Sequence, residues 1–175
     1  MPAAGPVTPH QALDLLADLG ASPWLVRHHE LVLEAAILIC DRLTGVAFDR
    51  DAVLVGAALH DAGKIVHPEE MSVAGSKHEG AGRELLLRRG IPALLASFCV
   101  THASWDAADC TLEDRLVALA DKLWKGKRDA ALEQRLVEEI AVATRAEPWE
   151  AFDLFDALCE AVAADGPDRL ARSIA

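Results

Sequence analysis

The stretch that most constrains this chain is LVGAALHDAGK, residues 54–64. Its first residues are small or aliphatic, which is typical of a buried helix, yet the stretch ends in an imidazole beside a carboxylate. An unpaired carboxylate is costly to bury, so His60 and Asp61 need a partner, and a metal ion suits this donor pair. Gly63 allows a sharp turn after the helix. For an isolated His-Asp pair, a helix cap followed by a turn is the alternative.

Composition limits the fold and the partners. The chain has 175 residues, of which 52% are hydrophobic, enough for one substantial core and most economically one domain. A net charge of -11 argues against a nucleic-acid partner, because phosphate-backbone binding needs a basic surface. No membrane-spanning apolar run and no signal sequence are visible, so we expect a soluble, cytoplasmic protein. Four cysteines without a CxxC pair indicate reduced thiols.

Apolar residues recur with a helical period, and no segment alternates as a half-buried strand does, so the sequence predicts an all-α fold. Caps and helix breakers predict helices over residues 9–19, 23–43, 49–60, 77–89, 93–103, 112–124, 129–145 and 148–164. Residues 65–77 are predicted to be a loop. We divide the chain into a leader and short helix (1–22), a metal-binding core (23–128), and helices that complete the same domain (129–175).

Two adjacent histidines occupy the second predicted helix. Glu30 and Glu34 define its polar face, so His28 is expected to point inward with the apolar residues and His29 to lie on the flank. A buried histidine is more often a satisfied core residue than a metal ligand, so His28 alone decides nothing.

Three further residues have the chemistry of ligands. His78 lies in the first turn of its predicted helix and His102 at the end of the next, where a histidine can simply favour the helix dipole. Asp121 interrupts an apolar segment much as Asp61 does, and a salt bridge to a nearby lysine is its alternative role.

The set as a whole favours a metal centre. His28, His60, Asp61 and Asp121 would supply four nitrogen and oxygen donors, which suit a divalent ion such as Mn, Fe, Co, Mg or Zn. His78 and His102 make room for a second ion. Coordination positions would remain for water and substrate.

These residues resemble the HD superfamily of metal-dependent phosphohydrolases. The superfamily signature consists of an early helical His, a His-Asp pair followed by Gly-Lys, and a later helical Asp. The resemblance covers about residues 24–128 of this chain, and the residues that match the signature are His28, His60, Asp61, Gly63, Lys64 and Asp121. The resemblance to binuclear members implies that Asp61 bridges two ions, with the second held by His78 and His102. The layout is most similar to bacterial HD-type symmetrical diadenosine tetraphosphatases, but it departs from them after His102 and after Asp121.

The resemblance implies hydrolysis of a phosphate ester or anhydride of a small molecule, most simply a nucleotide, by metal-activated water, with Asp61 and Lys64 as catalytic residues. Lys64 would hold a phosphoryl oxygen, Lys125 and Arg128 an outer phosphate, and Trp105 would stack on a base, although a buried tryptophan is an equal alternative. Two other functions stay open: a di-iron oxygenase on a similar scaffold, and a non-catalytic nucleotide sensor. Homodimerisation also stays open.

Overall fold

The computed structural model describes residues 7–174, and this part of the chain is helical and contains no β-strand. The predicted all-α fold is therefore confirmed. The elements are α1 (Pro9–Asp18), α2 (Pro23–Arg42), α3 (Arg50–Leu59), η1 (Ala62–Ile65), η2 (Pro68–Met71), α4 (Lys77–Arg88), α5 (Ala93–Thr101), α6 (Leu112–Leu123), α7 (Ala130–Thr144), α8 (Pro148–Ala164) and α9 (Gly166–Ser173). Most of the predicted leader, residues 1–6, lies outside the described residues.

Local capping fixes where the helices begin. The hydroxyl of Ser22 accepts from the amide of Leu25, and Pro23 follows at the first helical position. Thr111 and Asp114 form a reciprocal capping box at the start of α6. The sequence predicts both caps, with Glu113 or Asp114 as the partner of Thr111, because each cap joins residues close together in the chain.

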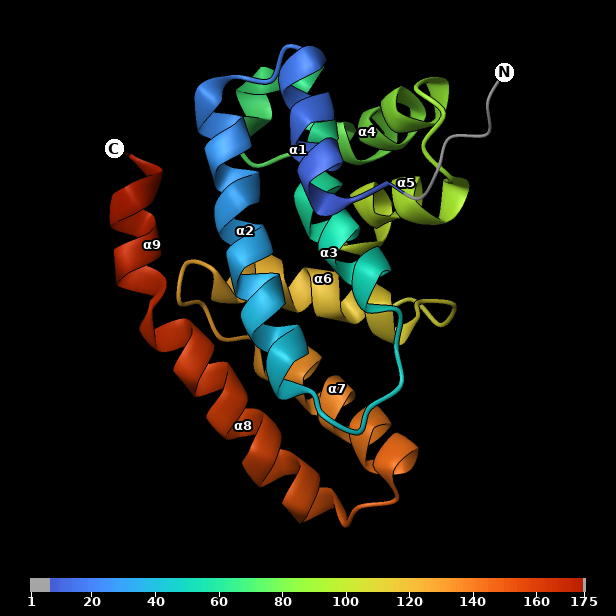
Figure 1. The fold of residues 1–175 in the computed structure, drawn as a ribbon, viewed down its shortest axis with the longest axis vertical. Coiled ribbons are helices and arrows are strands. Elements are labelled where there is room, and N and C mark those ends of the chain that lie inside the picture. The colour runs from blue at the N-terminus through green and yellow to red at the C-terminus, as the bar shows by residue number, and fades with distance from the viewer. Residues whose placement is uncertain (1–6, 175) are drawn as a thin grey trace.

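Helix α3 lies at the centre of the molecule, between α2, α5 and α6 (Figure 1). All of its residues from Ala52 to Leu59 are buried, as the sequence predicts. Gly56 permits this crowding, because a Cβ there would come within 2.9 Å of atoms in Phe98 and Val117. The helix therefore has no solvated face, and its end delivers His60 and Asp61 into the interior.

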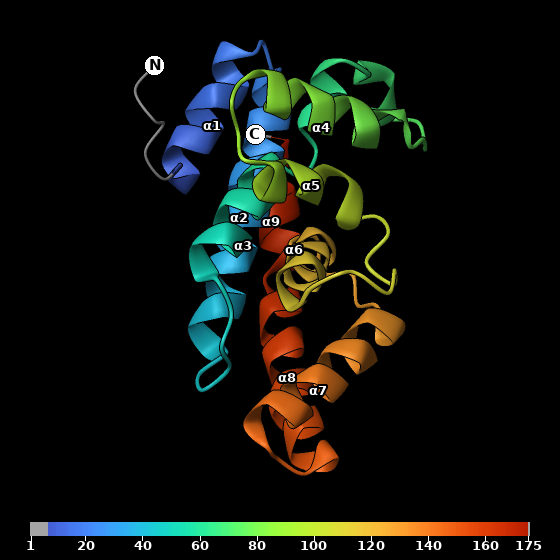
Figure 2. The ribbon, with the colours of Figure 1, turned by 90° about the vertical axis from the view of Figure 1, so that its right-hand side faces the viewer.

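Two hydrophobic clusters share α3. The larger joins α2, α3, α6, α7 and α8, and the smaller joins α1, α3, α4 and α5. Figure 2 shows α7 and the adjoining part of α8 extending away from the other helices. None of the helices within residues 7–174 is both long and apolar enough to span a bilayer.

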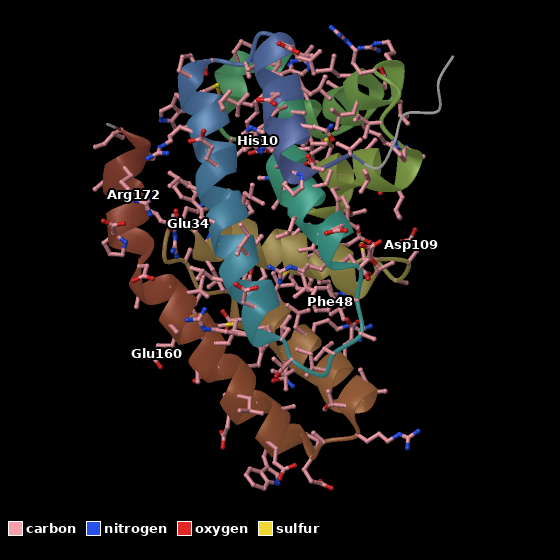
Figure 3. The ribbon with its side chains drawn as sticks, in the orientation of Figure 1. His10, Glu34, Phe48, Asp109, Glu160 and Arg172 are labelled. Carbon is pink, nitrogen blue, oxygen red and sulfur yellow. The ribbon has the colours of Figure 1, made fainter. Side chains whose placement is uncertain are left out.

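Helix α9 is missing from the sequence prediction. Its Arg169 is fully buried and donates to the carbonyls of Leu123, Trp124 and Val162, so it holds the end of α6 against the end of α8. Arg172 binds Glu34 of α2 through two hydrogen bonds of 2.8 and 2.9 Å (Figure 3). The Gly166-Pro167 pair suggests a helix end, but here the proline sits in the first turn of a new helix.

The predicted loop 65–77 is also more structured than expected, since it contains η2 and the last residue of η1. Element η1 meets α4 backbone to backbone. A Cβ at Gly63 would lie 1.8 Å from the carbonyl oxygen of His78, and a Cβ at Gly82 would lie 2.7 Å from the amide nitrogen of Gly63. Glycine at both positions is therefore what brings His78 toward Asp61.

We predict that Gly63→Ala destabilises the fold by about 3 kcal/mol, because backbone atoms of α4 must move. Gly80→Ala, within α4 itself, is the control: its Cβ would meet nothing within 4 Å, and alanine should stabilise the helix by about 0.5–1 kcal/mol. Urea unfolding followed by circular dichroism measures both. Equal stabilities would contradict the close approach of η1 and α4.

Candidate metal centre

Asp61 is the centre of the cluster that the sequence predicts. It follows the end of α3, is 3% exposed, and lies among histidines from three other helices. One candidate group contains His28, His60, Asp61 and Asp121, whose ligand atoms all lie within 4.8 Å of one another. Nε2 of His28 is 3.3 Å from Oδ2 of Asp61, and Nε2 of His60 is 3.3 Å from Oδ1 of Asp121.

The second candidate group uses the other oxygen of the same carboxylate. Nε2 of His78 lies 3.2 Å from Oδ1 of Asp61, and Nε2 of His102 lies 3.6 Å from it. The two oxygens of Asp61 thus face two different sets of imidazoles. Asp61 therefore belongs to both candidate ligand groups.

The hydrogen bonds at the far side of the rings indicate which nitrogens can bind a cation. Nδ1 of His60 is 3.0 Å from the carbonyl oxygen of Ala57, and Nδ1 of His102 is 2.9 Å from that of Phe98. A carbonyl only accepts, so each Nδ1 carries a proton and each Nε2 can present a lone pair to the cluster. Nε2 of His28 and Oδ1 of Asp61 are buried and make no hydrogen bond. These residues fit a divalent cation.

Electrostatics keep the carboxylate ionised. Burial opposes ionisation of Asp61, but the nearby His60, His28 and His78 outweigh it and lower its pKa well below the usual value. Burial lowers the pKa of His102 to about 4, so this ring is neutral at physiological pH, the state in which a histidine binds metal.

Comparison with known proteins matches residues 25–124 to the family described as HD domain. This match covers more than half of the chain. The chain belongs to the HD domain family. The family assignment agrees with the resemblance that the His-Asp signature indicates.

One curated relative is the tRNA (cytidine(56)-2'-O)-methyltransferase of Thermoplasma volcanium. It is 31% identical over 137 residues, which cover 70% of this chain and 38% of the relative. This HD-domain chain therefore spans less than half the length of that protein. No solved structure gives a significant match.

Two polar residues lie at the edge of the HD-domain cluster. Nζ of Lys64 lies 2.6 Å from Oδ2 of Asp61, so an ammonium occupies a position where a cation would contact that oxygen. The side chain of Asp121 is 26% exposed, far more than that of Asp61 or His60. The cluster therefore opens to solvent beside Asp121.

The prediction that His29 lies on the helix flank is wrong, because its side chain is fully buried. Its Nδ1 lies 3.3 Å from the carbonyl of Ala57, which His60 also contacts, and burial lowers the pKa of His29. A helical wheel with one polar face misplaces it, because α3 and α6 both pack on α2. His29 is absent from the two candidate ligand groups.

Of the predicted substrate contacts, Arg128 is engaged elsewhere. Its guanidinium donates to Glu133 at 2.6 and 2.8 Å and to Asp156 at 2.6 Å, so it joins the start of α7 to α8. These ion pairs compete with the phosphate contact predicted for Arg128, which stays a prediction. Three hydrogen bonds to two carboxylates leave its charge paired.

The structure also bears on the prediction that Trp105 stacks on a base. Trp105 is partly buried against the larger hydrophobic cluster. The tryptophans that contact His28 are Trp24, stacked at 6.4 Å between ring centroids, and Trp124, edge-on at 5.1 Å. Trp24 is 43% exposed, and Nζ of Lys125 lies 6.0 Å from the centroid of Trp124. Because Trp124 contacts the candidate ligand His28, Lys125 lies near the cluster, and it stays a predicted phosphate contact.

Sequence reasoning missed Trp24 and Glu70. Trp24 lies four residues before His28, a spacing that places both on one helix face. Glu70 lies in η2 and binds His78. A single acidic residue in a polar segment carries no sequence signal of such a contact.

We predict different losses at the two adjacent histidines of α2. His28→Ala removes a donor that faces Asp61 and should lower metal content. His29→Ala should leave metal content unchanged but cost about 1–3 kcal/mol of stability, because it empties a buried site and removes a hydrogen bond. Elemental analysis and thermal unfolding of both variants separate the effects. Loss of metal from His29→Ala alone would reverse the assignment.

Proposed function

We propose that this HD domain is a metal-dependent phosphohydrolase that cleaves a phosphate ester or anhydride of a small molecule, and that its substrate is a nucleotide. The observation that carries the proposal is the position of Asp61, whose two oxygens face separate sets of imidazole nitrogens. Two ions sharing one carboxylate suit in-line displacement at phosphorus, because both the attacking and the leaving oxygen need stabilisation.

The proposed chemistry divides among the residues. A divalent ion, when bound, acts as a Lewis acid that lowers the pKa of water and polarises a phosphoryl oxygen. His28, His60, Asp61 and Asp121 would hold one ion, and Asp61, His78 and His102 a second. Lys64, released from Asp61 by a cation at that oxygen, would bind a phosphoryl oxygen with its ammonium. The opening beside Asp121 admits the substrate.

Trp24 supports a nucleotide as the substrate. A large, partly exposed aromatic ring beside a candidate ligand offers a face on which a base can stack, and such stacking contributes about 1–3 kcal/mol per base. The net charge of -11 favours a small phosphorylated molecule over a nucleic-acid duplex.

The proposed hydrolysis differs from the activity in the name of the Thermoplasma volcanium relative, a methyltransferase. The shared segment is 38% of that protein, and the cluster of imidazoles and carboxylates in this chain suits metal-assisted hydrolysis.

The decisive experiment is a panel of nucleotides and phosphate esters assayed with Mn, Co, Mg and Fe. We predict that the native chain releases phosphate or a nucleoside phosphate, and that Asp61→Asn loses at least about a hundredfold in rate together with bound metal, since it removes the charge shared by the ions. Asp109→Asn, in the exposed loop before α6, is the control.

Three outcomes of the panel are informative. Hydrolysis that survives in Asp61→Asn contradicts the metal-centre mechanism. Turnover that requires iron and oxygen favours the oxygenase. Metal binding without product from any compound favours the nucleotide sensor.

We predict that Trp24→Ala raises KM for a nucleotide about tenfold or more while leaving KM for inorganic tripolyphosphate nearly unchanged, because only the nucleotide has a base to stack. Trp149→Ala is a matched control, since Trp149 is also exposed and also follows a proline at the start of its helix. Parallel losses on both substrates would mean that Trp24 only shields His28.

A further inference from the structure

The carboxylate of Glu70 contacts both the ring and the backbone amide of the candidate ligand His78. Oε2 of Glu70 lies 2.6 Å from Nδ1 of His78 and accepts from the His78 amide at 3.0 Å, and Oε1 accepts from the amide of Lys77 at 3.2 Å. The Glu70 side chain is only 6% exposed. Gly75 makes room for it, because a Cβ there would lie 2.2 Å from Oε1.

Two of these contacts cap α4. The N-cap residue Ser76 makes no side-chain capping hydrogen bond, and Glu70 takes over by accepting from the first two amides of the helix. The negative charge also suits the positive end of the helix dipole. Both oxygens of Glu70 accept from backbone amides, so the carboxylate acts as an acceptor at this helix end.

The third contact sets the chemistry of the imidazole. A carboxylate cannot donate, so Nδ1 of His78 must carry the proton, and in the neutral ring Nε2 then presents a lone pair to the region beside Oδ1 of Asp61, 3.2 Å away. His60 and His102 instead bind carbonyl oxygens of their own helices. The ring of His78 relies on a side chain from another element.

We propose that Glu70 is a positioning residue that fixes the ring orientation and tautomer of His78 and thereby holds the second metal ion of the centre. This inference rests on the proposed function only for its use of a second ion, and it makes no assumption about the substrate. A carboxylate bound to the outer nitrogen of a metal-binding histidine raises its basicity as a ligand, and loss of such a partner costs about 10- to 100-fold in metal affinity.

Glu70→Gln tests the role with little change in shape. The glutamine oxygen can still accept from a backbone amide and retain part of the cap. If the glutamine amide nitrogen faces Nδ1 of His78, it donates a hydrogen bond to that nitrogen. The ring proton then lies on Nε2, where it would block metal binding. Glu69→Gln is the matched control on the adjacent residue, because Glu69 is exposed and contacts His67. His78→Ala gives the reference for a lost second site.

The measurement is titration of metal-free protein with Mn²⁺ or Co²⁺ by calorimetry, with elemental analysis of the dialysed product. We expect two ions in the native chain and in Glu69→Gln. In Glu70→Gln we expect the weaker ion to lose about 10- to 100-fold in affinity, as in His78→Ala, while the tighter ion is retained. Nitrogen-15 spectra of the metal-free chain in alkaline buffer should show the His78 proton on Nδ1, and a changed tautomer population in Glu70→Gln.

Each contrary result has a definite meaning. Two ions bound by Glu70→Gln with native affinity and an unchanged tautomer, or only one ion bound by the native chain, would overturn the inference and leave Glu70 as a helix cap. A uniform loss of stability with intact ion binding would do the same. If the native chain binds two ions but hydrolyses nothing, the proposed function fails while the role of Glu70 stands.

Discussion

The structure depends on one buried carboxylate. Asp61 follows a helix that has no solvated face, and His60, His28 and His78 keep it ionised. Imidazoles from α2, α4 and the end of α5 face its two oxygens. Each contact fixes the position of one helix relative to α3. Helices α2 to α6 are therefore arranged so that their ligand-bearing residues lie near this carboxylate. The two hydrophobic clusters pack around them.

Small residues allow this convergence. Gly56 lets α3 pack against Phe98 and Val117, and Gly63 and Gly82 let η1 touch the backbone of α4. Larger side chains at these positions would separate the helices by more than the contacts around Asp61 tolerate, since those contacts are only 3.2–3.6 Å long. Packing and chemistry are thus set by the same residues.

The sequence predicts what is local and misses what depends on distant neighbours. Ser22, Thr111 and the buried stretch ending at His60 follow from capping and apolar periodicity, and so does the fold class. The family follows instead from the resemblance of the His-Asp signature, and the family match agrees with it. The sequence misplaces His29 because the surroundings of this residue come from other helices. The ion pair of Arg128 with Asp156 likewise has no signal in the sequence, because Asp156 lies in a distant helix. Glu70 was missed because its partner lies across an irregular turn, where no helical period relates the two. The six predicted ligands come together in the structure, although their roles stay predictions.

Apart from the adjacent His60 and Asp61, the donors of the cluster come from separate helices and lie far apart in the sequence, so the binding site exists only in the folded chain. An ion in the first group would be a removable cross-link among α2, α3 and α6, and an ion in the second group would link α3, α4 and α5. By mass action such a ligand stabilises the native state in proportion to the logarithm of its free concentration. The concentration of free metal would then change the melting temperature of the protein and its resistance to proteolysis, independently of any reaction that it catalyses.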